Sequence, residues 1–166
     1  MTLGLSLSAF TTLHVYISVI AIGSGLIVLL ALIGGRIFPL LTGLFLAATV
    51  ATSVTGFLFP FHGVTPAIKL GIISMVVLAV ALAARYLLHL AGIWRTTFVI
   101  ASALALYLNC FVLVVQTFLK VPAIHALAPT QTEPPFKIAQ ATLLLLFILL
   151  TVLAVQGFRR SAAIVA

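Results

Sequence analysis

Acidic side chains are almost absent from this chain. Glu133 is the only Asp or Glu among its 166 residues. Paired-carboxylate hydrolysis, carboxylate-rich metal clusters and relays of acidic groups each need at least two acids. A single copy of the chain therefore cannot carry out any of these, and a mechanism that needs one carboxylate must use Glu133.

Cysteines and catalytic motifs are equally scarce. Cys110 is the only cysteine, so an intrachain disulfide and a CxxC redox pair are both excluded. Its position inside an apolar run is typical of a small buried hydrophobic residue. The sequence contains no P-loop, nucleophile elbow, HExxH helix or dinucleotide-binding glycine pattern. We therefore expect a protein that is not an enzyme.

Charged residues make up only 5% of the chain, whereas 64% of its residues are hydrophobic. About a quarter of the residues in a soluble domain are charged, so this chain could not cover a surface that faces water. The net charge of +7 does not indicate nucleic-acid binding. The basic residues stand at the ends of apolar runs, as membrane topology requires, and form no stripe with interleaved aromatic residues.

Long apolar runs are what the sequence does contain. A bilayer core about 30 Å thick needs roughly 20 apolar residues per helix. Five runs meet this requirement, and Gly, Pro, Trp and Arg residues separate them. The sequence predicts an all-α integral membrane protein, a single domain over residues 1–166. Its expected spans cover residues 9–34, 38–60, 67–91, 96–119 and 138–157.

The basic residues also predict an orientation. Five spans place Arg36, Arg85, Arg95, Arg159 and Arg160 on one side, and Lys69, Lys120, Lys137 and Glu133 on the other. Cytoplasmic loops carry an excess of Lys and Arg, so we expect the N-terminus outside and the C-terminus inside. The predicted location is a cell membrane, of the bacterial inner-membrane type. Arg85 is then expected to extend toward the inner headgroups, and binding to anionic lipid is the alternative.

The segment between the last two spans, residues 120–137, is rich in proline. Its four prolines restrict the unfolded chain, and its apolar residues favour packing onto the membrane surface. We expect an ordered outer loop that covers the helix ends. Glu133 is expected to pair with Lys120, Lys137 or Lys69.

Two spans carry informative patterns. Small residues recur every four positions in the second span (Gly43, Ala47, Ala51 and Thr55), which predicts close helix contacts and a central place in the bundle. Ser102, Asn109 and Gln116 recur every seven positions in the fourth span and so share one face. That face serves either for hydrogen bonds between helices or as a polar wall.

The predicted topology gathers most polar residues at the outer end. The candidate ligand-binding residues are His14, His62, Lys69, Asn109, Gln116, Lys120, His125 and Glu133, with Lys137 and Gln140 nearby. Three ligands fit such a group. Two histidines can hold a haem, His and Gln can bond a quinone, and His14, His62 and His125 can bind a transition metal with Glu133. The plain alternative is a set of interfacial polar groups that close the bundle, with no cofactor required.

Three functions remain open at this point. The first is a small accessory, structural or ligand-binding subunit of a membrane complex, surrounded by lipid and oligomeric. The second is a quinone- or haem-binding redox protein with its site under the loop of residues 121–136. The third is an oligomeric channel or transporter lined by the polar residues of the fourth span.

Overall fold

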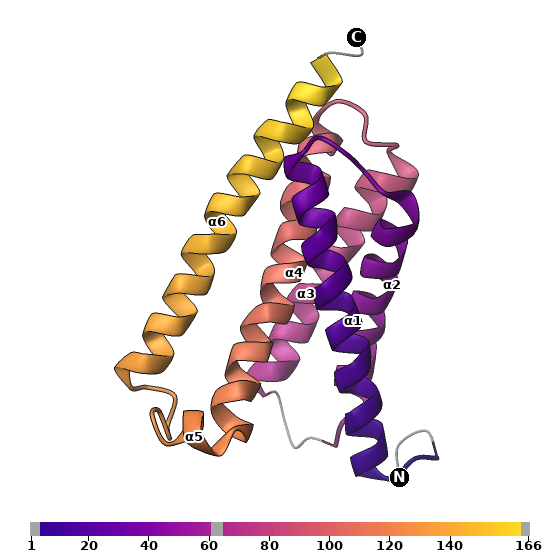
Figure 1. Ribbon diagram of the computed structural model, residues 1–166. Helices are drawn as coiled ribbons and strands as arrows, with labels where there is room; N and C mark the ends of the chain where they lie inside the picture. Colours follow the sequence, from indigo (N-terminus) through magenta and orange to yellow (C-terminus); the bar gives the residue numbers. More distant parts are fainter. Residues whose placement is uncertain (1–3, 61–64, 164–166) are drawn as a thin grey trace.

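The computed structural model describes residues 4–60 and 65–163, and the described part of the chain is built from helices. Five of these helices are long and apolar enough to cross a membrane, which confirms the predicted multi-pass helical class. The elements run in the order α1 (Leu7–Ile33), α2 (Pro39–Phe57), α3 (Pro66–Leu82), η1 (Ala83–Leu87), α4 (Ile93–Lys120), α5 (Pro122–His125) and α6 (Pro134–Ala163) (Figure 1).

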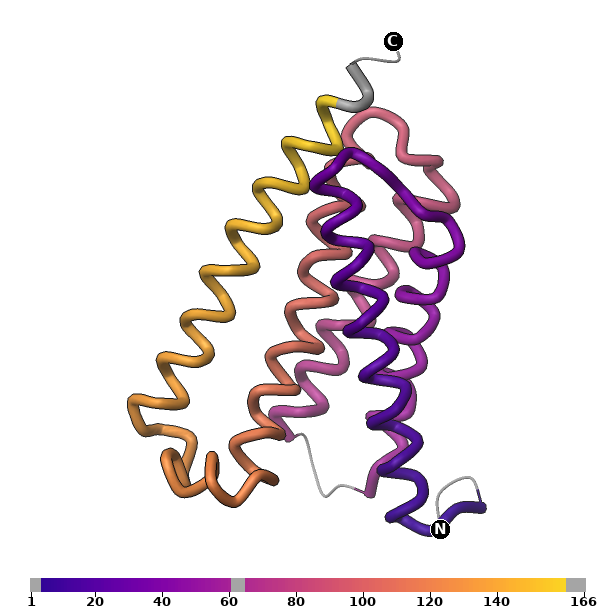
Figure 2. Tube along the Cα trace, viewed as in Figure 1, coloured from indigo at the N-terminus to yellow at the C-terminus, as the bar shows by residue number. Residues whose placement is uncertain are grey.

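The long helices alternate in direction, so the connections fall at two ends of the bundle (Figure 2). One end holds the α1–α2 and α3–α4 connections and the final turns of α6. We call it the arginine end, because every arginine in the sequence lies there. The opposite end, the loop end, holds the segment between α4 and α6 together with all three lysines and Glu133.

The centre of the bundle is α4, and the expectation that the second span would be central is wrong. In the apolar 18-residue stretch of each helix that could cross a membrane, 50% of the residues are buried in α4 and 28% in α2. The reason is a run of small residues that lets neighbouring backbones approach closely. Ala101, Ser102, Ala103 and Ala105 are all buried along this run.

The end of α3 differs from the predicted span of residues 67–91. The α-helix stops at Leu82 and continues as one π-helical turn through Leu87. Two non-glycine residues, His89 and Leu90, then adopt positive φ angles of 49° and 57°. Both the π turn and consecutive left-handed residues are rare in proteins, and both occur preferentially at functional sites.

The last helix, α6, begins at Pro134, four residues before the predicted start. Proline fits the first turn of a helix because the backbone N–H groups there have no partner within the helix. Toward the loop end α6 diverges from α4, whereas at the arginine end it returns to the bundle (Figure 1). Only 11% of the residues in its apolar 18-residue stretch are buried.

A glycine contact and an arginine fasten the arginine end of α6. A Cβ atom on Gly157 would lie 2.8 Å from the carbonyl carbon of Ile33, so the two backbones touch. Arg95 donates a hydrogen bond from Nε to the carbonyl oxygen of Phe158 over 2.8 Å. The guanidinium carbon of Arg95 also lies 3.7 Å from the centre of the Phe158 ring. These contacts hold the arginine end of α6, whereas at the loop end the two helices meet through side chains such as the rings of Phe118 and Phe136, whose centres lie 5.3 Å apart.

Candidate functional site

The segment between α4 and α6 is tied to the last turns of α4. His125 donates from Nδ1 to the carbonyl oxygen of Phe118 over 3.0 Å, since a carbonyl can only accept. The side chain of Gln131, a residue with φ of 59°, donates to the carbonyl oxygen of Val115 over 2.9 Å. Ala128 is fully buried within this segment. The expected loop of residues 120–137 thus contains a short helix and is anchored by side-chain bonds to α4.

Glu133 is held by its own loop, and the expected lysine pairing is wrong. The carboxylate accepts hydrogen bonds from the hydroxyl of Thr130 (2.8 Å), the N–H of Thr130 (3.2 Å) and the N–H of Thr132 (3.0 Å). Within residues 4–60 and 65–163, it forms no ion pair with Lys69, Lys120 or Lys137. Desolvation disfavours the charged form, but the hydrogen bonds outweigh it and lower the pKa of Glu133 from its ordinary value.

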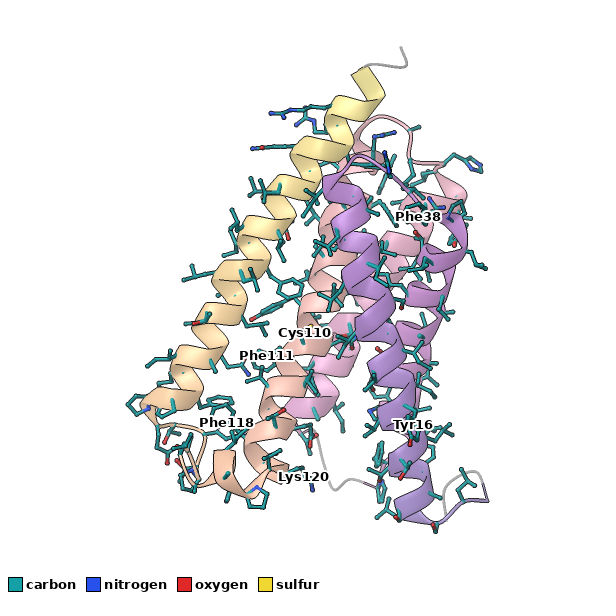
Figure 3. The ribbon with its side chains drawn as sticks, viewed as in Figure 1. Tyr16, Phe38, Cys110, Phe111, Phe118 and Lys120 are labelled. Carbon is teal, nitrogen blue, oxygen red and sulfur yellow. The ribbon has the colours of Figure 1, made fainter. Side chains whose placement is uncertain are left out.

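The divergence of α6 leaves a groove against α4. The groove has a volume of about 270 Å³, and its wall is almost wholly apolar. From α4 it is lined by Ile100, Ala103, Leu104 and Tyr107, and from α6 by Leu144, Phe147, Ile148, Thr151 and Val152. The ring of Tyr107 meets that of Phe147 edge-on at 5.7 Å, and Phe111 and Phe118 lie on the side of α4 that faces α6 (Figure 3).

Gln140 marks the end of this groove nearest the loop. It stands one helical turn before Leu144 on α6 and donates from Nε2 to the carbonyl oxygen of Phe111 over 3.3 Å. Phe111 in turn stands one turn beyond Tyr107 on α4. The other amide atom of Gln140, Oε1, is buried and has no hydrogen-bond partner in the described part of the chain. Gln140 does not itself line the groove, but it stands one turn from the lining residue Leu144 and carries one unused hydrogen-bond acceptor.

His14 belongs to a different part of the loop end. Its Nδ1 lies 2.7 Å from the hydroxyl oxygen of Thr55, and that hydroxyl donates its proton to the carbonyl oxygen of Ala51 over 2.7 Å. The Thr55 hydroxyl therefore links the His14 ring to the backbone of α2. The imidazole also packs edge-on against the Phe59 ring at 5.2 Å. This small cluster closes the ends of α1 and α2.

The structure brings together only some of the predicted site residues. His125 and Glu133 share the loop with Gln140 beneath it, whereas His14 stands between α1 and α2. Among the described residues no contact joins His14 to His125, and no group of three metal-ligating side chains forms. His62 lies outside the described residues. Lys69, Gln116 and Lys120 are exposed.

The polar face of α4 is divided between two environments. Asn109 packs against α2, where its Nδ2 lies 3.5 Å from the hydroxyl of Thr49. Ser102 is buried at 3% exposure, while Gln116 faces outward. The three residues therefore form no continuous wall in one subunit. The groove-lining residues Tyr107 and Phe147 escaped sequence reasoning, because long apolar helices give no sign of which faces separate.

Comparison of this chain with protein-family models, curated proteins and solved structures finds no match.

Proposed function

We propose that this chain is a non-catalytic, ligand-binding subunit of a membrane complex, and that the groove between α4 and α6 holds a lipid-like molecule. The observation that carries the proposal is the pairing of an almost wholly apolar groove of about 270 Å³ with the unpartnered Oε1 of Gln140 at its end. Binding sites for small apolar molecules commonly combine an apolar lining with very few polar groups that fix orientation.

The hydrogen-bonding chemistry of Gln140 and the apolar groove restricts the class of ligand that can bind. Gln140 Oε1 can only accept a hydrogen bond, so the head of the ligand must donate one. A quinol hydroxyl does so, and its isoprenoid tail matches a groove lined by aliphatic and aromatic side chains. A lipid with a free hydroxyl head is the simplest other molecule of this chemistry. Tyr107 and Phe147 offer their ring faces and edges to a planar head group.

The proposal includes a membrane orientation. We place the loop end outside and the arginine end inside, because five arginines against three lysines favour a cytoplasmic arginine end. The head of the ligand would then lie in the outer leaflet, under the segment that contains Glu133. A reporter fused to the C-terminus tests this orientation, and reporter activity that requires export would reverse it.

The other two functions receive less support from the geometry. A haem with two axial histidines needs a convergent pair, and His14 and His125 are anchored at separate places. A channel between copies needs Ser102 and Asn109 on an open surface, but Ser102 is buried and Asn109 faces α2. An absorbance spectrum with a Soret band would revive the haem hypothesis.

Organic extraction of the purified protein followed by mass spectrometry tests the proposed function. We expect one quinol or hydroxyl lipid per chain in the wild-type extract, and a loss of about tenfold or more in Gln140→Leu, which removes the hydrogen-bonding head. Gln156→Leu is the matched control, because Gln156 is an exposed glutamine on the same helix and is not among the residues that line the groove. Equal recovery from both variants would count against the proposal.

A further inference from the structure

The arginine end has no acidic side chain of its own. All five arginines lie there, and the only acid in the sequence is Glu133 at the loop end. The Glu133 carboxylate is already engaged by Thr130 and Thr132. No acidic side chain of this chain can therefore pair with a cation that is buried at the arginine end. The counter-charge must come from another molecule.

Arg85 is such a cation. The π turn of η1 places it beside Ala84, which is fully buried, and turns its side chain toward α4. The guanidinium carbon lies 5.6 Å from the Tyr86 ring centre and 5.7 Å from that of Phe98. Its Nε is buried and has no hydrogen-bond partner among the described residues. An unpaired buried donor is costly, and more so when it is charged, so the position calls for an acceptor.

Two buried hydroxyl groups also lack a hydrogen-bond acceptor. Thr42 on α2 is fully buried and Ser102 on α4 is 3% exposed, and neither hydroxyl has a partner in the described part of the chain. The contact between Thr49 and Asn109 fixes the level of these two parallel helices. Thr42 and Ser102 each stand seven residues earlier, so they lie at one common level nearer the arginine end.

Arg85 lies within about one helical turn of this level. The Tyr86 hydroxyl lies 3.7 Å from where a Cβ on Gly43 would stand, next to Thr42 in the chain. Phe98, against which Arg85 packs, is one helical turn before Ser102. Helix register thus places three buried donor atoms that have no hydrogen-bond partner among the described residues, Arg85 Nε and the hydroxyls of Thr42 and Ser102, in one layer near the end of the bundle.

We propose that this layer, made by Arg85, Thr42 and Ser102, binds a phosphate-bearing anion. A phosphate group offers several acceptor oxygens around one negative charge, so it can accept from a guanidinium and from hydroxyls together. In a membrane the phosphate comes from the headgroup of an anionic phospholipid, and in solution from free phosphate. The site lies at the opposite end from the Gln140 groove and does not depend on the ligand proposed there.

Thermal unfolding of the detergent-purified, delipidated protein tests this site. Cys110 is buried, so a dye that fluoresces on reaction with thiols reports the unfolding midpoint. We expect phosphatidylglycerol to raise the midpoint above that in phosphatidylcholine of the same chain length. We expect Arg85→Met to abolish the difference and to weaken lipid binding in native mass spectrometry by about tenfold or more. A parallel arm with inorganic phosphate, against chloride at equal ionic strength, separates a phospholipid site from a site for free phosphate.

Arg159→Met is the matched control, because Arg159 is an exposed arginine at the same end. It should keep the full phosphatidylglycerol effect. If Arg85→Met does not fold, Arg85→Lys carries the test, because lysine keeps the charge and lacks Nε. It should bind several-fold more weakly than Arg159→Lys. Equal midpoints in both lipids without any response to phosphate, or equal losses at positions 85 and 159, would overturn the proposal.

Discussion

The contact of Gly157 with α1 makes a prediction whose size follows from the structure. In Gly157→Ala the new Cβ would clash first with the carbonyl oxygen of Ile33 and would stand 2.8 Å from its carbonyl carbon and 3.2 Å from its Cα. These are backbone atoms, which cannot rotate away, so α6 must shift outward. Overpacking of this kind costs about 1–3 kcal/mol. Alanine also recovers about 1 kcal/mol of helix propensity relative to glycine.

Gly23→Ala provides the matched control. Gly23 is also inside a long helix, but a Cβ there meets nothing within 4 Å. Gly23→Ala should gain only the helix propensity of alanine. The free energies of unfolding of the two variants should therefore differ by the cost of the clash, about 1–3 kcal/mol, or roughly 2–12 °C in melting midpoint. The Cys110 thiol-reactivity assay measures both midpoints. A Gly157→Ala protein that melts at or above the Gly23→Ala midpoint would refute the close approach of α6 to α1.

Two further predictions concern the ends of α6. Because the pKa of Glu133 is lowered in the folded protein, its stabilisation is complete above the ordinary carboxyl pKa of about 4.3 and is lost as the pH falls through the folded value. Hydrogen exchange at residues 130–133, corrected for intrinsic rates, should be faster in Glu133→Gln than in wild type at pH 7, and this difference should vanish in acid. Lys137→Met should exchange at the wild-type rate. Exchange at residues 130–133 that is no faster in Glu133→Gln than in Lys137→Met would contradict the local hydrogen bonds. Arg95→Lys should lower the melting midpoint by the equivalent of about 1–2 kcal/mol, because lysine lacks both the Nε donor and the planar face that meets Phe158; an unchanged midpoint would mean that this contact contributes little.

The sequence was sufficient for the fold class, because apolar length and the placement of basic residues are properties of the chain alone. It was not sufficient for the packing order. The four-residue pattern of small residues suggested that the second span was central, yet the alanines and serine of α4 carry the centre. Every apolar helix face looks alike in sequence, whether it meets lipid or another helix.

The candidate site was predictable only in outline. The proline-rich segment and Gln140 drew attention to the loop end, but the hydrogen-bond donors to Glu133 could not be assigned from charge alone. Lysines look like its natural partners, whereas Thr130 and Thr132 are closer along the chain and supply local donors. The buried, unpartnered Oε1 of Gln140 depends on the angle of α6, which no local pattern encodes.

Native mass spectrometry from gentle detergent shows whether the groove between α4 and α6 holds one lipid-like molecule. Ile148 lines the groove, while its neighbour Leu149 is equally exposed and does not, at 52% and 55% respectively. We expect a wild-type mass with one retained ligand, loss of this ligand in Ile148→Trp, which fills the groove, and its retention in Leu149→Trp. A ligand kept by Ile148→Trp, or no ligand on the wild-type protein, would show that the groove does not hold such a molecule.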